Sequence, residues 1–281
     1  MAAFLRFLLI GLTLLAAARV SAGDSRDDGQ VDMALIVSVD VSGSVDERRY
    51  ELQMDGIAKA LNDPEVIAAM LSGPRGRIMF TMVEWSEQAE PAIPWTRLAS
   101  REDILALAAR VRRTPRPAGE FTCVAHMMSV VHDLIVPTLP VAARRVVMDV
   151  SGDGVDNCDG EDATADMRDR LTAEGVTING LPINESNPEQ PLGAGAYRAP
   201  GRPFENRANV AEIKTLEPWY RQYVIGGDGA FLVPARGYGD FDRAIKQKFA
   251  MEISGRPPAS TRIRLSAAAS PSPTNPDGRA K

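Results

Sequence analysis

The stretch VDMALIVSVDVSGSVDERRY (residues 31–50) opens with a short apolar run, Met33 to Val39, which has the length and β-branched content of a buried strand. The run ends on Asp40, and a charged segment with helical patterning follows. A strand that leads into a helix in this way indicates an open α/β sheet, and ligands bind such sheets at the carboxyl ends of the strands. Asp40 therefore stands where a binding site is expected.

Oxygen-bearing side chains gather at this strand end, namely Asp40, Ser42 and Ser44. With no thiol or imidazole among them, they suit a hard cation such as Mg²⁺. The alternative is ordinary turn chemistry, an Asx turn followed by a helix N-cap. The strand in front and the helix behind favour the metal interpretation.

The DVSGS motif at residues 40–44 resembles the D-x-S-x-S motif of von Willebrand factor type A domains, where it forms the first part of a metal-ion-dependent adhesion site. The resemblance spans roughly Asp32 to Met251, and it is to an uncharacterised secreted bacterial branch rather than to the integrin or matrix members. It implies an α/β fold with a doubly wound, mostly parallel six-stranded sheet, strand order 3-2-1-4-5-6, and helices on both faces. The alternation of strand-like and helical segments indicates the same class.

In that family a threonine before a central helix and an aspartate after the fourth strand complete the metal site. Thr122 and Asp153 stand in those contexts here. The resemblance implies that Ser42, Ser44 and Thr122 bind the ion through their hydroxyls. It also implies that Asp40 and Asp153 hold the ion directly or through water. The expected ion is Mg²⁺, with Mn²⁺ or Ca²⁺ as alternatives, and a partner's carboxylate would fill the open coordination position.

The sequence departs from the family pattern at one point of this set. The family usually has a Ser/Thr-Asp-Gly tripeptide after the fourth strand, whereas here Gly152 separates Ser151 from Asp153. Asp149 or Asp156 could therefore be the ligand instead. Asp153 is preferred because Asp149 lies inside the apolar run, where the strand should still be paired.

The chain has two cysteines, Cys123 and Cys158, and an even number in an exported protein predicts one disulfide. Cys123 directly follows Thr122, and Cys158 comes shortly after Asp153. If the family fold holds, these loops are neighbours, and the bridge would limit how far the two ligand loops move apart. An ordinary structural cross-link is the alternative.

The chain divides into three parts. Residues 1–22 combine an early positive charge, a short apolar run and a small-residue cleavage pattern, which predict a secretory signal peptide rather than a membrane anchor. Residues 23–253 form the expected von Willebrand A-like domain, and residues 254–281 read as a disordered Pro/Ser/Arg tail. The protein is expected in the periplasm or outside the cell, with no stable membrane span after cleavage.

The formal net charge is −5, and the tail is basic, so the folded part is more acidic than the whole chain. An acidic body argues against nucleic acid as a partner. Beside Thr122, the residues Arg112, Arg113 and Arg116 could steer an acidic partner toward the metal, although a solvated loop is the favoured interpretation.

Other chemistries fit the sequence less well. The two histidines, His126 and His132, are six positions apart and point to different faces of a helix, which disfavours a zinc pair. There is no G-x-S-x-G and no GxxxxGK[ST] motif. We therefore expect a non-enzymatic module that captures an acidic group of a protein partner through a divalent cation. A metal-assisted hydrolase is the second hypothesis, and a structural envelope protein with a stabilising metal is the third.

Overall fold

The apolar runs of the sequence form one central sheet in the computed structural model, which describes residues 29–184 and 216–255. Strand β1 (Met33–Asp40) lies in the middle of this sheet and is buried along its whole length. Burial on both faces explains why its sequence is continuously apolar instead of alternating. The apolar run from Met33 to Val39 is thus part of the central strand of the fold.

The sheet order is β3-β2-β1-β4-β5, and the expected α/β class with a mostly parallel sheet is confirmed. Strands β2 (Ile78–Trp85) and β4 (Val146–Gly152) flank β1 in parallel, and β5 (Val176–Pro182) continues the parallel part. Strand β3 (Ala89–Leu98) pairs antiparallel with β2 at the edge.

The expected number of six strands is wrong for the described residues, in which the sheet has five. The segment 230–235 lies beside β5, but it pairs only through isolated parallel bridges, Gly180 with Leu232 and Ile183 with Ala235. Val233 and Ala235 donate to the carbonyls of Gly180 and Pro182, and the gap in the ladder lies at Pro182, which has no backbone N–H to donate to this segment. The sixth position is filled by an interrupted strand.

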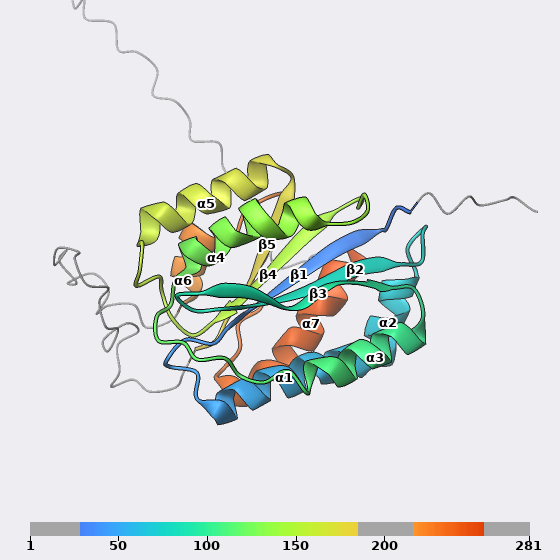
Figure 1. The fold of residues 1–281 in the computed structure, drawn as a ribbon, viewed down its shortest axis with the longest axis horizontal. Coiled ribbons are helices and arrows are strands. Elements are labelled where there is room, and N and C mark those ends of the chain that lie inside the picture. The colour runs from blue at the N-terminus through green and yellow to red at the C-terminus, as the bar shows by residue number, and fades with distance from the viewer. Residues whose placement is uncertain (1–28, 185–215, 256–281) are drawn as a thin grey trace, which may run out of the picture.

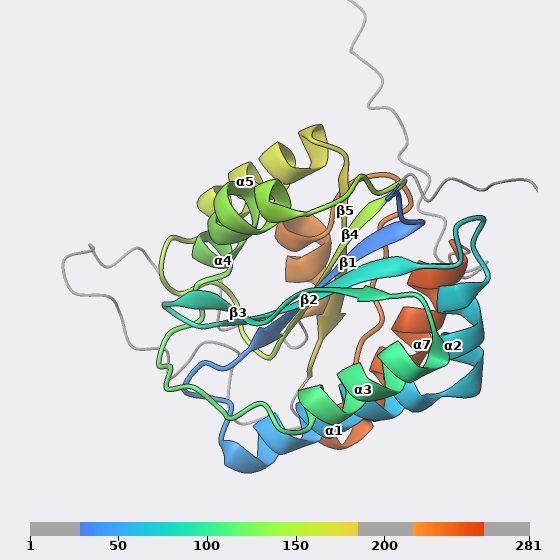
Figure 2. The same ribbon diagram turned by 45° about the vertical axis from the view of Figure 1, so that its right-hand side comes forward.

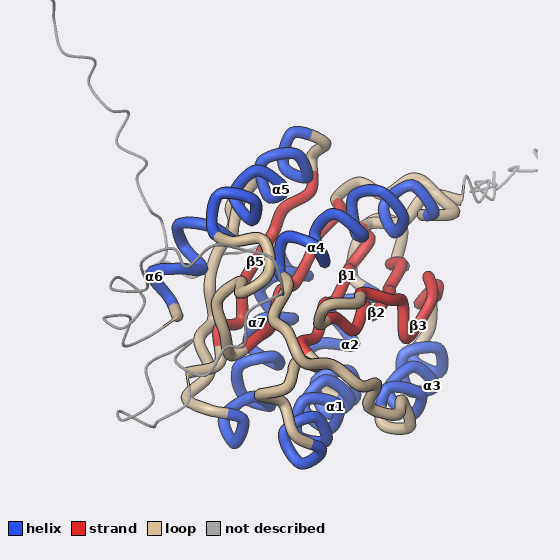
Figure 3. Tube along the Cα trace, turned by 60° about the vertical axis from the view of Figure 1, so that its left-hand side comes forward, coloured by secondary structure: helices blue, strands red, loops and turns tan. Residues whose placement is uncertain are grey.

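Helices cover both faces of the sheet (Figures 1 and 2). One face carries α1 (Glu47–Asn62), α2 (Pro64–Leu71), α3 (Arg101–Val111) and α7 (Phe241–Ser254). The other face carries α4 (Val124–Val130), α5 (Glu161–Ala173) and the short α6 (Glu217–Trp219). Each face has its own apolar core, so the sheet is the middle of three layers, as the tube in Figure 3 shows.

Short irregular turns extend several of these helices. A π-helical turn, Val131–Ile135, and a 3₁₀ turn, Val136–Thr138, continue α4. A second π-helical turn, Tyr220–Val224, continues α6, and a 3₁₀ turn, Tyr238–Asp240, leads into α7.

Side-chain caps fix where two of the helices begin. Asp46 accepts a hydrogen bond from the backbone N–H of Arg49 at the start of α1, at 2.8 Å. Ser100 accepts from the N–H of Asp103 at the start of α3, at 3.1 Å, and Asp103 accepts in return from Ala99, at 3.0 Å. The N–H groups of Arg49 and Asp103 belong to the first helical turn and have no partner within the helix, so the caps set the direction in which each helix leaves its loop.

Two sequence predictions lie outside the described residues: the signal peptide and most of the tail. Within the described ranges, no helix is long and apolar enough to cross a membrane.

Close contact between α1 and α7 gives a test of the packing. A Cβ atom on Gly56 of α1 would lie 2.7 Å from Phe241 Cδ1 and 3.2 Å from Asp242 Cα. We expect Gly56→Ala to lower the free energy of unfolding by about 1–2 kcal/mol, because overpacking outweighs the helix-propensity gain of roughly 1 kcal/mol. Urea denaturation measures the change.

Gly239→Ala is the matched control, since a Cβ at Gly239 meets nothing within 4 Å. Equal stability of the Gly56→Ala variant and the unmodified protein would contradict the close packing of the two helices.

Candidate metal centre

The loop after β1 holds its three oxygen-bearing side chains close together. Asp40 is fully buried, and its Oδ1 accepts a hydrogen bond from the backbone N–H of Ser42 at 2.8 Å. The hydroxyls of Ser42 and Ser44 lie 3.2 Å apart. The Asx-type turn that the sequence offered as an alternative is therefore present, and it also gathers the oxygens that a cation would need.

Asp153 reaches this loop from the far end of β4. The Ser44 hydroxyl donates to Asp153 Oδ1 at 2.6 Å, although 109 positions separate the two residues. The parallel pairing of β1 with β4 makes this possible, because both strands end at the same edge of the sheet. The hydroxyl and the carboxylate chosen from the sequence are in direct contact.

Gly152 explains the departure from the usual tripeptide. A Cβ atom at Gly152 would lie 2.9 Å from Asp40 Oδ2 and 3.0 Å from the Tyr220 hydroxyl, so no side chain fits there. Ser151 points elsewhere, since its hydroxyl donates to the carbonyl of Ser38 at 3.2 Å. The glycine thus lets the strand end approach the Asp40 carboxylate closely, and Asp153 follows as the next side chain.

Thr122 is buried beside the same loop. Its backbone N–H donates to Asn157 Oδ1 at 3.0 Å, and its carbonyl accepts from the N–H of Asn157 at 2.9 Å. A Cβ atom at Gly154 would lie 3.3 Å from Thr122 Oγ1, which places this hydroxyl against the residue after Asp153.

The disulfide between Cys123 and Cys158 is present and joins the same two loops, with their Cα atoms 5.1 Å apart. Together with the paired backbone contacts between Thr122 and Asn157, it holds the start of α4 against the loop after β4.

The two other aspartates weighed from the sequence are engaged elsewhere. Asp149 lies inside β4, and its Oδ1 is 2.7 Å from the Lys248 Nζ of α7. The Asp156 carboxylate accepts backbone N–H groups at 2.7–3.0 Å, from Ala125, Cys158, Asp159 and Gly160. Asp156 therefore ties the loop to the start of α4, which leaves Asp153 as the aspartate that contacts the serine hydroxyls.

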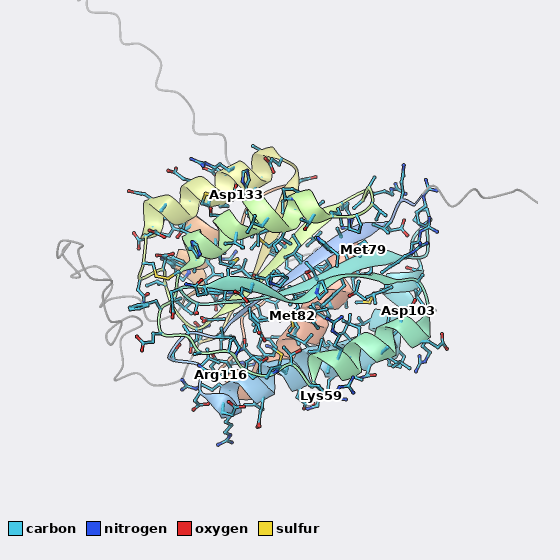
Figure 4. All side chains as sticks on the ribbon, in the orientation of Figure 1. Lys59, Met79, Met82, Asp103, Arg116 and Asp133 are labelled. Carbon is cyan, nitrogen blue, oxygen red and sulfur yellow. A yellow bond between two sulfur atoms is a disulfide. The ribbon has the colours of Figure 1, made fainter. Side chains whose placement is uncertain are left out.

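Arg116 has a structural role that the sequence did not indicate. Its Nε donates to the carbonyl of Val45 at 2.8 Å, and its Nη2 donates to the carbonyls of Val41 and Ser42 at 3.2 and 3.3 Å. Figure 4 shows it close to the amino-terminal end of α1. Arg112 is also engaged, with its Nε 3.1 Å from Asp55 Oδ1. Arg116 is thus held by the loop after β1, whereas Arg112 stays exposed, as the solvated-loop interpretation expects.

Glu87 holds residues 120–121, which belong to the loop between α3 and α4. It accepts the backbone N–H groups of Glu120 and Phe121 at 2.9 and 3.0 Å, and the N–H of Gly43 donates to the carbonyl of Glu120 at 3.2 Å. Neither Glu87 nor Arg116 belongs to a motif. Arg116 stands near the predicted ligand Thr122 in the sequence, but no sequence signal indicates Glu87.

Burial removes the carboxylates of Asp40 and Asp153 from water, and few protein groups replace the lost hydrogen bonds. Burial, followed by repulsion from Asp153, raises the pKa of Asp40 to about 7. Burial also raises the pKa of Asp153, against the opposing effects of the Ser44 hydrogen bond and the Arg49 charge. Asp40 Oδ2 is buried and has no hydrogen-bond partner among the described residues.

This environment fits a hard divalent cation. Two neighbouring carboxylates and three hydroxyl-bearing residues supply only oxygen donors, and an unpartnered carboxylate oxygen faces the strand end. In the described part of the chain, no group of three or more His, Cys, Asp or Glu side chains could hold a metal. A cation bound here would therefore depend on the hydroxyls of Ser42, Ser44 and Thr122.

Solved structures with the same fold are von Willebrand factor A-type domains and proteins that contain them. Proximal thread matrix protein 1 from the mussel byssus matches with a TM-score of 0.56 at 13% identity, over 80% of this chain and 49% of that chain. A von Willebrand factor type A protein from Catenulispora acidiphila matches at 0.50 and 16%, over 80% and 43%. The pilus adhesin SpaC from Lactobacillus rhamnosus GG matches at 0.53 and 12%, over 80% and 30%.

The fold is thus of the von Willebrand A type, as the sequence resemblance implied, and the chain spans about half or less of the length of these proteins. The chain itself belongs to the family described as "Protein of unknown function (DUF1194)", whose model matches residues 30–257. No curated protein matches it.

The raised pKa of Asp40 predicts a cation-dependent pH profile. Without a cation, the folded-state pKa of about 7 exceeds the ordinary value of 3.8, so the folded state binds the proton more tightly. The free energy of unfolding then falls as pH rises between these two values, by up to a few kcal/mol. We expect Mg²⁺ to restore stability at about pH 8 and to have little effect at about pH 5, as measured by denaturation at each pH.

Asp40→Asn separates this effect from the other buried carboxyls. Burial also raises the pKa of Asp149 to about 7 and of Glu84 to about 6, and both remain in the variant. Stabilisation by Mg²⁺ that is equal in the variant and the unmodified protein would show that Asp40 does not bind the ion.

Arg116 predicts a second measurable effect. Arg116→Met removes the donors that hold the carbonyls of the Ser42 loop, so we expect the free energy of unfolding to fall by about 1–3 kcal/mol. Mg²⁺ affinity, measured by titration calorimetry, should fall as well because the loop loses its preorganised shape. Arg113→Met, at an exposed position of the same loop, is the control and should leave both quantities unchanged.

Proposed function

We propose that the chain is an exported binding module that captures an acidic group of a protein partner through a divalent cation. Asp40, Ser42, Ser44, Thr122 and Asp153 would hold the ion. The observation that carries this proposal is the 2.6 Å contact between Ser44 and Asp153, which unites two distant loops around the buried Asp40 carboxylate.

The five residues would contribute two kinds of ligand, neutral hydroxyls and charged carboxylates. Hydroxyls from Ser42, Ser44 and Thr122 would coordinate as neutral oxygens. Asp40 and Asp153 would supply the negative charge, either directly or through water. With only two acids in the set, the bound ion would remain electrophilic enough to attract a third carboxylate. Mg²⁺ is the first expectation, and Mn²⁺ or Ca²⁺ would suit the same oxygen donors.

The exposure of the loop supports an open position on its outer side. Gly43 and Ser44 are exposed, whereas Asp40 and Ser42 are buried. Protein groups therefore surround the inner side of the proposed ion, and solvent or a partner can reach the outer side past Ser44. A carboxylate is the side chain best suited to that position, because it brings the charge that the ion still lacks.

The similar solved structures are consistent with binding rather than catalysis. They include a pilus adhesin and a byssus matrix protein, and one structure of the latter, at a TM-score of 0.50 and 15% identity, has a zinc-occupied MIDAS motif. Those properties belong to the named proteins. For this chain they support the proposal of a non-enzymatic role and of a divalent ion, with the ion's identity left to measurement.

Export is part of the proposal. The signal-peptide pattern of residues 1–22 supports it, and so does the Cys123–Cys158 disulfide, since such bonds persist in oxidising compartments. A periplasmic or secreted location would also place the module where envelope or extracellular partners are available.

Affinity capture tests the binding function. The mature protein is immobilised and offered periplasmic extract with Mg²⁺ or with EDTA. We expect a partner to be retained only with Mg²⁺ and to be lost with Asp40→Ala or Thr122→Val. Thr164→Val, at a buried threonine whose hydroxyl bonds to the carbonyl of Gly160, is the matched control and should still capture it.

The same variants distinguish the alternatives. A structural envelope protein with a stabilising metal would lose thermal stability with Asp40→Ala, and no partner would be released by EDTA. A metal-assisted hydrolase would turn over ester or phosphate substrates in a Mg²⁺-dependent way. Retention of the partner by Asp40→Ala in EDTA would overturn the proposed function.

A further inference from the structure

A buried cluster of charged side chains lies outside the candidate metal centre, between α7 and the sheet. Lys248 of α7 is fully buried, and its Nζ lies 2.7 Å from Asp149 Oδ1 of β4 and 2.5 Å from Glu252 Oε1. Asp149 and Glu252 are each at most 2% exposed. Burying an amine and two carboxyl groups is costly unless every group is paired, so the cluster needs an explanation.

Neighbouring groups hold Glu252 in place. Asn179 of β5 donates from Nδ2 to Glu252 Oε1 at 2.8 Å, and its Oδ1 accepts the backbone N–H of Phe231 at 3.0 Å. The Lys248 Nζ lies 5.7 Å from the centre of the Phe231 ring. The amine is therefore enclosed by one aromatic ring and two carboxyl groups.

The cluster is not satisfied as an ordinary ion pair. Three oxygen atoms have no hydrogen-bond partner among the described residues: Asp149 Oδ1, Asp149 Oδ2 and Glu252 Oε2. The Lys248 Nζ lies 2.7 Å from Asp149 Oδ1, and its charge lowers the Asp149 pKa against the larger effect of burial. This close approach places the amine beside the carboxyl group of Asp149.

Charge balance favours a shared proton within the cluster. One ammonium group faces two carboxyl groups, and full ionisation would leave a net negative charge in a dry site. Burial raises the pKa of Asp149 to about 7, with Glu252 adding to the rise and Lys248 opposing it. The cluster is neutral when it has one ammonium group, one carboxylate and one carboxylic acid. Moving a proton from the ammonium group to the carboxylate then gives a free amine between two carboxylic acids.

We propose that the Lys248 amine and the Asp149 carboxyl group join in an intramolecular amide bond, which the chain forms without another enzyme and with Glu252 as the proton carrier. The bond would link α7 covalently to β4.

The step balances without an oxidant or a co-reactant. Nζ of neutral Lys248 attacks Cγ of the Asp149 carboxylic acid, while Glu252 donates its proton to the carboxyl oxygen. Glu252 then takes a proton from the nitrogen and delivers it to a hydroxyl on Cγ, and the C–O bond breaks. The remaining hydroxyl returns its proton to Glu252. The products are an Nζ–Cγ amide, one water molecule and Glu252 as it began.

The surroundings favour condensation over hydrolysis. The fold holds the two groups in contact, which gives the effective concentrations of roughly 10⁵–10⁸ M found for oriented intramolecular reactions. Burial keeps bulk water away from the product. The amide also replaces two groups that are costly to bury when ionised.

Intact-mass spectrometry of the mature, exported protein tests the proposal. After reduction of the disulfide and denaturation, the mass should be lower by one water than the mass of the same chain calculated from its sequence and its measured N-terminus. After trypsin, the segment 146–168 should stay joined to the segment 247–262, with the branch at Asp149 and Lys248.

Glu252→Gln and Lys248→Met should each restore the full sequence mass, and Glu252→Gln keeps the shape of the cluster. The Lys59 amine, 2.9 Å from Asp55 on the exposed side of α1, is the matched control and should remain unlinked. A reduced protein with the full sequence mass would overturn the proposal. Loss of one ammonia instead of water would place the bond on Asn179 and would overturn the assignment to Asp149.

Discussion

The hydrogen bond from Ser44 to Asp153 is the contact on which the candidate site depends. It joins the loop after β1 to the loop after β4, and it exists because two parallel neighbours of one sheet end at the same edge. Gly152 allows the close approach, because any side chain there would collide with Asp40. Arg116 and Glu87 then fix the loops around this contact from outside the motif.

Strand β4 and the loop after it carry two buried aspartates, Asp149 and Asp153, whose surroundings differ. Asp149 faces α7 and meets an amine of the chain, whereas Asp153 faces the β1 loop and meets hydroxyls. The first carboxylate therefore lies against a positive group of the protein, whereas the second, just past the end of β4, contacts a hydroxyl.

The sequence allowed the central strand, the fold class and the Asp40–Ser44 loop to be predicted, because apolar runs and short motifs are local signals. The contact of Asp153 with Ser44 followed only from the family resemblance. The sixth strand failed because Pro182 removes a donor from a ladder that periodicity alone does not describe. Arg116, Glu87 and the Lys248 cluster were not predictable, since each acts on residues far away in the sequence and in no recurring pattern.

The two edges of the sheet differ from its middle in one further respect. Strand β3 includes Pro91 and Pro94, and the segment around Pro234 lies along β5 at the opposite edge. A strand from another molecule needs free, regularly spaced N–H groups to add to a sheet, and prolines interrupt that row on both sides. The domain is thus poorly suited to self-association through sheet extension, which favours a module that remains dispersed at high local concentration.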